Sequence, residues 1–303
     1  MTSDKLHIGF IGLGIMGTPM AGHLARAGYP MTIHDINRAR ADALAAQFPE
    51  VIIADSPDVV GAGSDVVITM LPSGAYVREA ALGDRGLIHG LKPGSLLLDT
   101  SSCEPWLTVE TAAALAAREI AMVDAPVSGA EAGARAAELV FMAGGAPEAL
   151  ERVLPLLEVL GKRVFHLGPV GAGHAMKCIN NTITAMTFLA TSEGLVLGKK
   201  FGLDPDVMTD VLNHSTGMSW ISQTHIKQRI ISRKFDDPFK LELMMKDIGI
   251  AMHLAGDLDL SLPLCSRGQE LWNRASQHAA KGSSVSQLVR WVEQATGVEI
   301  TSG

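Results

Sequence analysis

Short apolar segments alternate with amphipathic segments over the first half of the chain. Compact apolar runs bounded by turn-forming residues predict strands, and the longer segments between them predict helices. We expect strands at residues 6–11, 31–34, 65–70, 95–99, 120–124 and 139–143, and helices at residues 19–27, 57–61, 75–82, 105–117 and 147–160. Strands that alternate with helices form a parallel sheet covered on both faces. Residues 1–168 are therefore predicted to be an α/β domain with a doubly wound, mostly parallel sheet.

The pattern changes after Gly168-Pro169, where strand-like runs stop. Residues 172–200 read as one long helix, and only helices follow it. These are expected at residues 204–212, 220–231, 240–257, 262–280 and 284–295. The second domain, residues 169–303, is predicted to be all-α and joined to the first by the long helix. A chain of 303 residues exceeds the usual size of a single core, about 250–300 residues, which agrees with two domains.

Charge and hydropathy exclude several classes of partner. The net charge is −7 and no basic run occurs, which argues against nucleic acid and anionic membrane surfaces. No uninterrupted apolar stretch is long enough to cross a membrane, and the first residues lack a secretory signal. The three cysteines, Cys103, Cys178 and Cys265, are widely spaced and odd in number. We expect reduced thiols and a cytoplasmic protein, or one in an organelle matrix if a transit peptide is missing.

A glycine motif directly follows the first predicted strand. Its residues are Gly12, Leu13, Gly14, Ile15, Met16 and Gly17, and a predicted helix comes next. In this context the first glycine permits a tight turn, the second lets the backbone approach a pyrophosphate, and the third lets the helix pack on the strand. The motif predicts a dinucleotide site.

Asp35 ends the second predicted strand, 18 residues after Gly17. A carboxylate there accepts hydrogen bonds from the adenosine ribose hydroxyls and repels a 2′-phosphate, which favours NAD over NADP. Arg38 and Arg40 follow closely and would accept that phosphate if Asp35 turned away. NAD is the expected cofactor, and NADP stays open.

Two more loops follow predicted strands at the edge where such sheets bind ligands. Met70, Leu71 and Pro72 form a turn that could pass over the dinucleotide or simply end a strand. Thr100 and Ser101 offer hydroxyls to the nicotinamide ribose, although hydroxyl residues here could equally cap the next helix.

The segment Asp124-Ala-Pro-Val-Ser128-Gly129 follows another strand. The Ser128 hydroxyl and the free N–H groups at Gly129 could form a small anion nest that grips a carboxylate without an arginine. A Gly-Ser turn that leads into a helix is also common without any ligand.

Lys177 and Asn181 lie one turn apart on the long predicted helix, so a cation and a carboxamide share one face. A helical lysine ordinarily extends to water, and its apolar neighbours could be plain core. Together with the dinucleotide motif, the pair instead indicates acid/base chemistry on an alcohol, because burial brings a lysine pKa toward the working pH.

No metal is expected. His166, His174, His214, His225 and His253 are scattered without ligand spacing, and we interpret them as surface or capping residues. Asp237 before Pro238 is typical of a turn.

Four ordered motifs resemble the β-hydroxyacid dehydrogenase family, which includes 3-hydroxyisobutyrate dehydrogenase and tartronate semialdehyde reductase. They are the glycine motif through Met20-Ala21, the segment 124–129, Gly171-x-Gly173-x-x-x-Lys177-x-x-Asn180-Asn181, and Lys246-Asp247. The likeness spans essentially the whole chain. It implies an N-terminal Rossmann domain and a helical second domain. The chain departs from the family pattern at two positions, with Ala130 where many members have a second Gly and Gly22 where Asn is frequent.

The resemblance further implies residue roles. Lys177 is the catalytic acid/base and Asn181 orients the substrate. Ser128 and Gly129 bind the substrate carboxylate, with Ala130 and Asn180 beside them, and Lys246 reaches cofactor and substrate. Trp220 could cover the substrate or anchor a core, and Phe239 is a candidate pocket contact.

The resulting hypothesis is NAD-dependent oxidation of a short β-hydroxy acid, or reduction of the matching semialdehyde. The alternatives are an NADPH-preferring semialdehyde or imine reductase of the same fold, and a non-catalytic dinucleotide-binding module; Lys177 argues against imine reduction and against loss of catalysis. Small residues along the long helix (Ala185, Ala190, Ser192, Gly194 and Gly198) permit close helix packing. We expect a homodimer or homotetramer.

Overall fold

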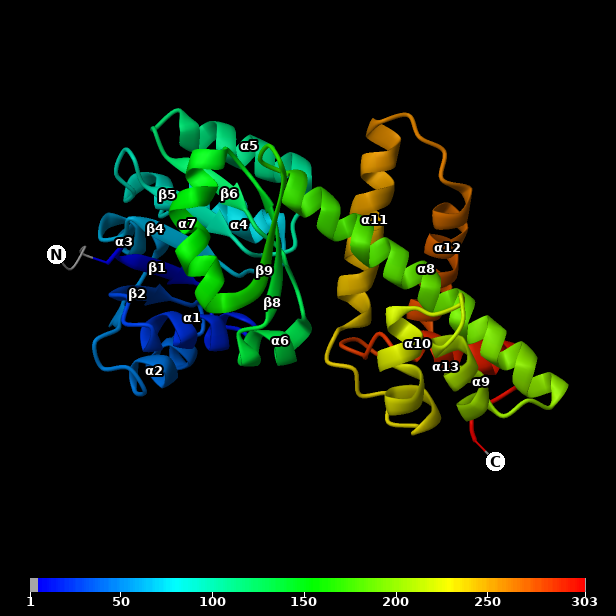
Figure 1. The fold of residues 1–303 in the computed structure, drawn as a ribbon. Coiled ribbons are helices and arrows are strands. Elements are labelled where there is room, and N and C mark those ends of the chain that lie inside the picture. Colours follow the sequence, from blue (N-terminus) through cyan, green and yellow to red (C-terminus); the bar gives the residue numbers. More distant parts are fainter. Residues whose placement is uncertain (1–4, 303) are drawn as a thin grey trace. The chain divides into compact units, whose positions relative to one another are not determined.

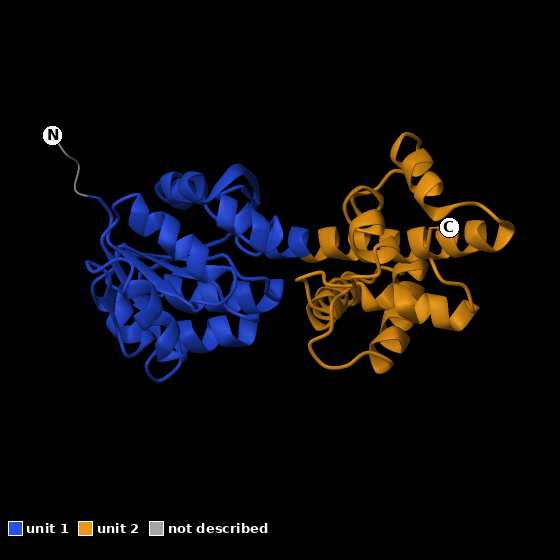
Figure 2. Ribbon diagram, turned by 90° about the horizontal axis from the view of Figure 1, so that it is seen from below, with its two compact units in different colours: residues 1–177 blue, residues 178–303 orange. Residues whose placement is uncertain are grey.

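A computed structural model describes residues 5–302 of the chain (Figure 1). Its internal contacts divide the chain into two compact units, residues 1–177 (unit 1) and residues 178–303 (unit 2), coloured separately in Figure 2. This division falls inside the long helix, a few residues beyond the boundary predicted at residue 168.

The strands of unit 1 form one sheet. They are β1 (Ile8–Ile11), β2 (Met31–His34), β3 (Ile52–Ile53), β4 (Val66–Thr69), β5 (Leu96–Asp99), β6 (Ala121–Asp124), β7 (Val127–Ser128), β8 (Leu139–Gly144) and β9 (Gly161–Gly168). The spatial order is β3-β2-β1-β4-β5-β6-β8-β7, with β9 paired to β8. All neighbours from β3 to β6 run parallel. The predicted doubly wound, mostly parallel sheet is confirmed.

The far end of the sheet differs from a simple parallel array. Strand β8 pairs antiparallel with both β6 and β7 and parallel with β9. The two-residue strands β3 and β7 are too short to give an apolar run. Strand β9 was not predicted because exposed Lys162 and Arg163 interrupt its apolar residues.

Helices cover both faces of this sheet. They are α1 (Gly17–Arg26), α2 (Arg38–Ala45), α3 (Pro57–Ala62), α4 (Gly74–Leu82), α5 (Pro105–Ala116), α6 (Ala130–Ala136) and α7 (Pro147–Leu160), with a short 3-10 turn, η1 (Leu87–His89). Alternate residues of β5 enter different cores, because Leu96 and Leu98 join one apolar cluster and Leu97 joins another. A strand buried on both sides has no polar alternation, so β5 appears in the sequence as a continuous apolar run.

Helix α8 (Ala172–Phe201) begins in unit 1 and continues into unit 2. Its first turn is held by Asp124 at the end of β6, whose two carboxylate oxygens accept hydrogen bonds from the amides of Gly171 (2.6 Å) and His174 (2.8 Å). These amides have no partner within the helix, so the carboxylate acts as a cap supplied from the sheet.

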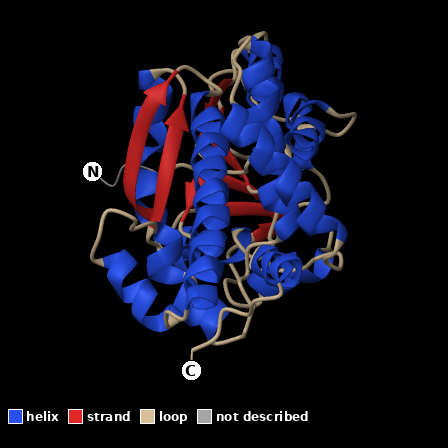
Figure 3. Cartoon of the chain, turned by 90° about the vertical axis from the view of Figure 1, so that its right-hand side faces the viewer, coloured by secondary structure: helices blue, strands red, loops and turns tan. Residues whose placement is uncertain are grey.

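Within residues 178–302, the regular secondary structure is helical apart from an isolated bridge between Lys240 and Ser284, and loops join the helices (Figure 3). After α8 come α9 (Pro205–Asn213), α10 (Trp220–Thr224), the π-helix η2 (Ile226–Ile231), α11 (Leu241–Asp257), α12 (Pro263–Gln277) and α13 (Gln287–Thr296). Its core centres on fully buried Phe188 and Trp272, and the Trp272 indole donates to the Ala185 carbonyl over 3.3 Å.

The single helix predicted at residues 220–231 is wrong in detail. The His225 carbonyl accepts from the amides of both Arg229 (2.8 Å) and Ile230 (3.3 Å), so the helical turn widens there. The apolar periodicity of the sequence does not register this change, because a single wider turn hardly alters the spacing of the apolar residues.

Among residues 5–302, no helix combines the length and apolar character needed to cross a membrane.

Candidate active site

The predicted cofactor loops follow parallel strands whose ends are in register. Ile11 pairs with both His34 and Thr69, and Thr69 pairs with Asp99. The loops after β1, β2, β4 and β5 therefore emerge at one edge of unit 1. Ligands of open α/β sheets bind at this carboxyl edge.

The glycine motif has the local geometry that a dinucleotide requires. A Cβ on Gly17 would lie 1.9 Å from the Gly12 carbonyl oxygen, so α1 can begin this close to β1 only with glycine. A Cβ on Gly14 would meet no atom within 4 Å. The space beside Gly14 is open to a pyrophosphate, and the exposed side chain of Ile15 lies beyond it. The residues present fit the cofactor.

Asp35 is buried and holds the glycine loop. Its Oδ2 accepts from the Leu13 amide over 2.6 Å, and its Oδ1 accepts from the Asn37 amide over 2.7 Å. The Arg40 guanidinium lies 3.6 Å from the same carboxylate. Contact of Asp35 with an adenosine ribose stays a prediction.

Arg38 is directed to other carboxylates. Its guanidinium pairs with Asp42 at 2.9 Å and with Asp55 at 3.1 Å. Of the two arginines that could accept a 2′-phosphate, Arg38 is therefore already engaged, and Arg40 lies against the acid that would repel such a phosphate.

The hydroxyls of Thr100 and Ser101 are both buried and bonded within the protein. Thr100 donates to the Thr69 carbonyl over 2.7 Å, and Ser101 Oγ accepts from the Leu71 amide over 2.9 Å. These bonds fix the turn Met70–Pro72 against the loop after β5. Their predicted contact with a nicotinamide ribose stays a prediction.

A buried cluster in unit 1 escaped the sequence analysis. Asp99, Cys103, Asp124 and His174 come together at the ends of β5 and β6 and the start of α8. His174 is fully buried, 3.6 Å from Asp99 and 3.7 Å from Asp124. The expectation that the histidines are surface or capping residues is therefore wrong for His174, which lies buried inside α8. The sequence signal that could have indicated this cluster is the pair Asp99 and Asp124, because each of them ends one of two neighbouring strands.

Asp99, Cys103 and His174 have the composition of a metal site, with ligand atoms within 4.8 Å of one another. Their polar atoms nevertheless have protein partners. His174 Nε2 donates to the Ser101 carbonyl (3.1 Å), His174 Nδ1 lies 2.7 Å from the Thr108 hydroxyl, and Cys103 Sγ donates to Asp99 (3.3 Å). The cluster is accounted for as a hydrogen-bonded support for the start of α8.

Burial raises the pKa of the Asp124 carboxyl above its usual value, against the opposite effects of the His174 imidazole and the two capping amides.

Lys177 and Asn181 are both buried on α8, one turn apart. Asn181 Nδ2 donates to Asp247 of α11 over 2.5 Å, and its Oδ1 accepts from Asn180 over 3.1 Å. Lys246 Nζ lies 3.5 Å from the other oxygen of Asp247. Asp247 is thus a further candidate site residue. The Lys246-Asp247 motif was part of the family resemblance, but only Lys246 was given a role from it.

The Ser128 side chain is half-buried at the end of β7. Gly129 has φ of 133° and Ala130 has φ of 51°. These left-handed conformations expose the turn before α6, and only a glycine adopts the first without strain. Ala130, where many family members have glycine, therefore carries backbone strain.

Trp220 begins α10 and its side chain is 58% exposed. It is therefore not the core anchor that the sequence left open. Phe239 is partly buried just before α11. The Trp220 ring lies against that of His225, which is buried and forms the C-cap of α10, in agreement with the capping role that was one of the two expectations for the histidines.

Cys178 follows Lys177 and is buried. Burial, together with the nearby Asp247 carboxylate, raises the pKa of its thiol to about 11. The thiol stays protonated at neutral pH, which supports a structural role.

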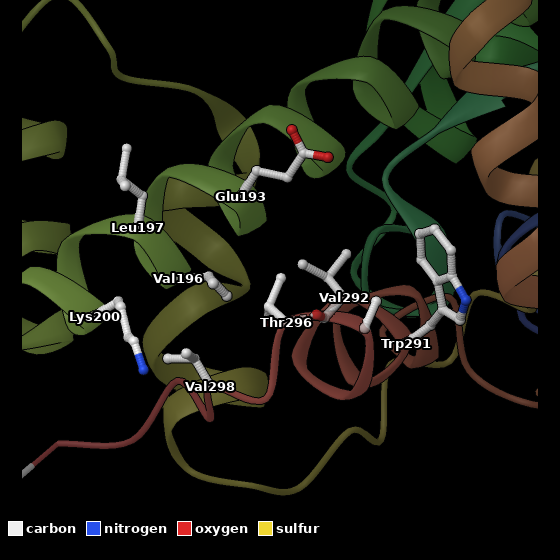
Figure 4. A pocket seen from close by; sticks show the side chains of 9 residues that line it. Glu193, Val196, Leu197, Lys200, Trp291, Val292, Thr296 and Val298 are labelled. Atoms are coloured by element: carbon white, nitrogen blue, oxygen red, sulfur yellow. Dashed lines mark hydrogen bonds between the residues drawn. The ribbon is translucent and has the colours of Figure 1, made fainter.

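A cavity of about 380 Å³ in unit 2 lies away from these residues (Figure 4). Its lining comes from α8 and from the C-terminal region around α13: Glu193, Val196, Leu197, Lys200, Trp291, Val292, Ala295, Thr296 and Val298. Glu193 follows Lys177 by about 16 residues, or about 24 Å along a helix axis. The cavity is not part of the candidate active site.

Family models match nearly the whole chain. Residues 7–168 match the NAD binding domain of 6-phosphogluconate dehydrogenase, and residues 171–292 match the NAD-binding model of NADP-dependent 3-hydroxyisobutyrate dehydrogenase.

Individual relatives agree. The chain is 33% identical over 299 residues to 2-(hydroxymethyl)glutarate dehydrogenase of Eubacterium barkeri, covering 99% of each chain. It is 38% identical over 271 residues to NAD-dependent L-serine dehydrogenase of Pseudomonas aeruginosa, covering 88% of this chain and 90% of the relative. Among solved structures, 3-hydroxyisobutyrate dehydrogenase of Mycobacterium tuberculosis with L-serine has a TM-score of 0.87 and 32% identity, covering 95% of this chain and 99% of that one.

Proposed function

Because the chain belongs to the β-hydroxyacid dehydrogenase family, we propose that it oxidises a short β-hydroxy acid with NAD, or reduces the matching semialdehyde. Membership makes it an oxidoreductase that acts on a CH–OH group and uses a nicotinamide dinucleotide, NAD or NADP. The proposal adds the substrate, the preference for NAD and the catalytic residues. Its main support is the placement of buried Lys177 beside Asn181 on α8.

The substrate class is suggested by what three relatives share. The relatives are named for L-serine, 3-hydroxyisobutyrate and 2-(hydroxymethyl)glutarate. Each of these acids carries a CH₂OH group on the carbon next to a carboxylate. We therefore expect a primary β-hydroxy acid.

The dinucleotide supplies the hydride acceptor when it is bound. The glycine loop and Asp35 would hold it, because Gly14 leaves room for the pyrophosphate and the Asp35 carboxylate lies beside that loop. The buried Asp35 carboxylate beside the glycine loop supports NAD, because it would repel a 2′-phosphate.

Lys177 would exchange a proton with the substrate oxygen. In oxidation its amine removes the hydroxyl proton, and in reduction its ammonium protonates the forming alkoxide. Asn181, fixed by Asp247 and Asn180, would hold the substrate hydroxyl in line with this transfer. We propose that Lys246 and Asn180 assist in binding.

The other end of the substrate needs an anion site. The Ser128 hydroxyl and the amides of the turn at Gly129 and Ala130 would bind the carboxylate. Trp220 and Phe239 would contact the substituent on the neighbouring carbon.

One plate of short β-hydroxy acids crossed with NAD and NADP, followed by absorbance of the reduced nicotinamide, tests the proposal. Turnover of at least one of the three acids with NAD is expected. Lys177→Ala should lower kcat by roughly 10²- to 10⁴-fold and leave NAD binding intact, because the acid/base group acts in the transition state. Retained kcat in this variant would show that Lys177 is structural.

Two further properties are proposed with the function. Exposed apolar side chains on α8 and α9, including Leu197, Phe201 and Val207, support a homodimer or homotetramer. Free Cys103, Cys178 and Cys265 suit a reducing compartment, in agreement with a cytoplasmic location.

A further inference from the structure

A buried His–Asp pair in unit 2 has no part in the function proposed so far. His225, between α10 and the π-helix, places its Nε2 against Oδ2 of Asp237 in the segment before α11. Only 6% of His225 and 7% of Asp237 are exposed. Ionisable side chains are seldom buried unless they are paired, as these two are.

The histidine side of the pair holds Trp220. The two rings lie 4.5 Å apart between centroids at an angle of 55°. His225 Nδ1 is also 2.8 Å from the Thr224 hydroxyl, which donates to the Trp220 carbonyl over 2.7 Å. Both the ring and the main chain of Trp220 are therefore tied to His225.

The aspartate side holds Phe239. Oδ1 of Asp237 accepts from the Phe239 amide over 2.8 Å, while Oδ2 faces His225. Although burial opposes ionisation, the hydrogen bonds from His225 and from this amide hold the pKa of the Asp237 carboxyl below its usual value. The carboxylate is thus ionised at neutral pH and connects the His225 side chain to the main chain at Phe239.

A third element fixes the pair from behind. The ring of Phe188 meets the His225 ring edge-on, with centroids 5.8 Å apart and an angle of 76°. Phe188 lies on α8 seven residues after Asn181, and therefore on nearly the same helical face. The His225 ring is accordingly packed against the helix that carries the candidate catalytic residues.

We propose that His225 and Asp237 are positioning residues that set substrate selectivity, by holding Trp220 and Phe239 as a fixed wall for the substituent next to the carboxylate. An exposed tryptophan that can change rotamer adapts to substrates of different size, whereas one held by a buried His–Asp pair discriminates between them. This inference rests on the proposed function, in which both aromatic residues contact the substrate.

The test compares two β-hydroxy acids, 3-hydroxyisobutyrate and 3-hydroxypropionate, which differ by one methyl group on the carbon next to the carboxylate. His225→Leu and Asp237→Asn each break the pair. We expect the ratio of kcat/KM for the two acids to change by roughly tenfold, the scale of discrimination that one methyl group gives in a fixed pocket. The change should appear mainly in KM for the acid, with KM for NAD unaltered.

A second readout needs no substrate. Acrylamide quenching of Trp220 fluorescence, isolated by subtracting Trp220→Phe, should increase when the pair is broken. Thr224→Val, which removes the hydroxyl that joins His225 Nδ1 to the Trp220 carbonyl, should move quenching and selectivity in the same direction and serves if a His225 or Asp237 variant does not fold. The matched control is His253→Gln, because His253 and Asp257 form an exposed His–Asp pair on α11 at 3.6 Å.

A selectivity ratio that stays constant in all three variants overturns the inference, even if the melting temperature falls, because a purely structural pair would affect stability alone. If the wild type turns over no β-hydroxy acid, the proposed function fails, and quenching then decides the positioning role. Unchanged quenching would refute it, and increased quenching would support it.

Discussion

Asn181 on α8 donates to Asp247 on α11 over 2.5 Å, and both side chains are buried. The carboxamide oxygen accepts from Asn180, so both ends of the group are engaged. A half-turn of the Asn181 carboxamide would place its NH₂ group against the NH₂ donor of Asn180 and its oxygen against the Asp247 carboxylate. Both contacts would be repulsive. Asp247 thereby selects the orientation in which Asn181 would meet a substrate hydroxyl.

Asp247→Asn should therefore lower kcat by about tenfold or more, since a hydrogen bond to a charged group contributes about 1.5–3 kcal/mol and tenfold corresponds to about 1.4 kcal/mol. Steady-state kinetics at saturating NAD would measure this. Asp257→Asn, at the exposed end of the same helix, should leave kcat as it is. A normal kcat for Asp247→Asn would separate Asn181 from catalysis.

The Asn181–Asp247 contact shows where sequence reasoning stops. The strands β4 and β5 were predictable because burial on both faces leaves a continuous apolar run, and the glycine motif was predictable because its spacing is local. Asp247 lies 66 residues from Asn181, and Asp237 and His225 are joined across the loop that follows the π-helix. Nothing in the periodicity of either segment encodes such a pairing. The burial of His174 was not predicted for the same reason, since its partners Asp99 and Asp124 belong to separate strands.

Cofactor preference depends on Asp35. Asp35→Ser should narrow the preference for NAD over NADP by about tenfold or more, or about 1.4 kcal/mol, because the ribose acceptor and the repulsion of a 2′-phosphate are both lost. The ratio of kcat/KM for the two dinucleotides is the measurement. Because Asp35 also accepts from the Leu13 amide, a fall in both values is expected beside the change in their ratio. A wild type that already prefers NADP would contradict the assignment and point to Arg40.

The exposed apolar surface of unit 2 predicts self-association. Phe201 is 83% exposed and Leu197 is 73% exposed on α8, whereas Ala185 and Ser192 of the predicted small-residue stripe are buried within the unit. The larger exposed residues are thus better candidates for an interface than that stripe. Light scattering should give a dimer or tetramer for the wild type and a smaller mass for the double variant Leu197→Asp/Phe201→Asp. A monomeric wild type at micromolar concentration would rule the interface out.

Asp124 should make unfolding pH-dependent in a recognisable direction. Burial raises its folded-state pKa, so the folded state binds this proton more tightly than the unfolded state does. The resulting stability is fully present below the unfolded value, about 3.9, and is lost as pH rises through the folded pKa.

Asp124→Asn removes that titration. It also removes one of the two carboxylate acceptors for the Gly171 and His174 amides, which adds a cost that is independent of pH. The wild-type minus variant free energy of unfolding, from urea titrations between pH 4 and 7, should therefore fall with pH, by at most about 1.4 kcal/mol per pH unit. A difference that rises with pH would mean that the capping amides outweigh burial and lower this pKa.

The proposed carboxylate site gives the most direct test of the substrate class. If Ser128 and the amides of the Gly129 turn bind the substrate carboxylate, its methyl ester should be a poor substrate, because hydrogen bonds to an ionised acceptor contribute about 1.5–3 kcal/mol. Ser128→Ala should then weaken turnover of the acid and spare the ester, so that the gap in kcat/KM between them shrinks. General damage to the protein would lower both alike, and the double comparison removes it. An enzyme that turns over ester and acid equally would refute the anion site, and with it the assignment of a hydroxy acid as the substrate.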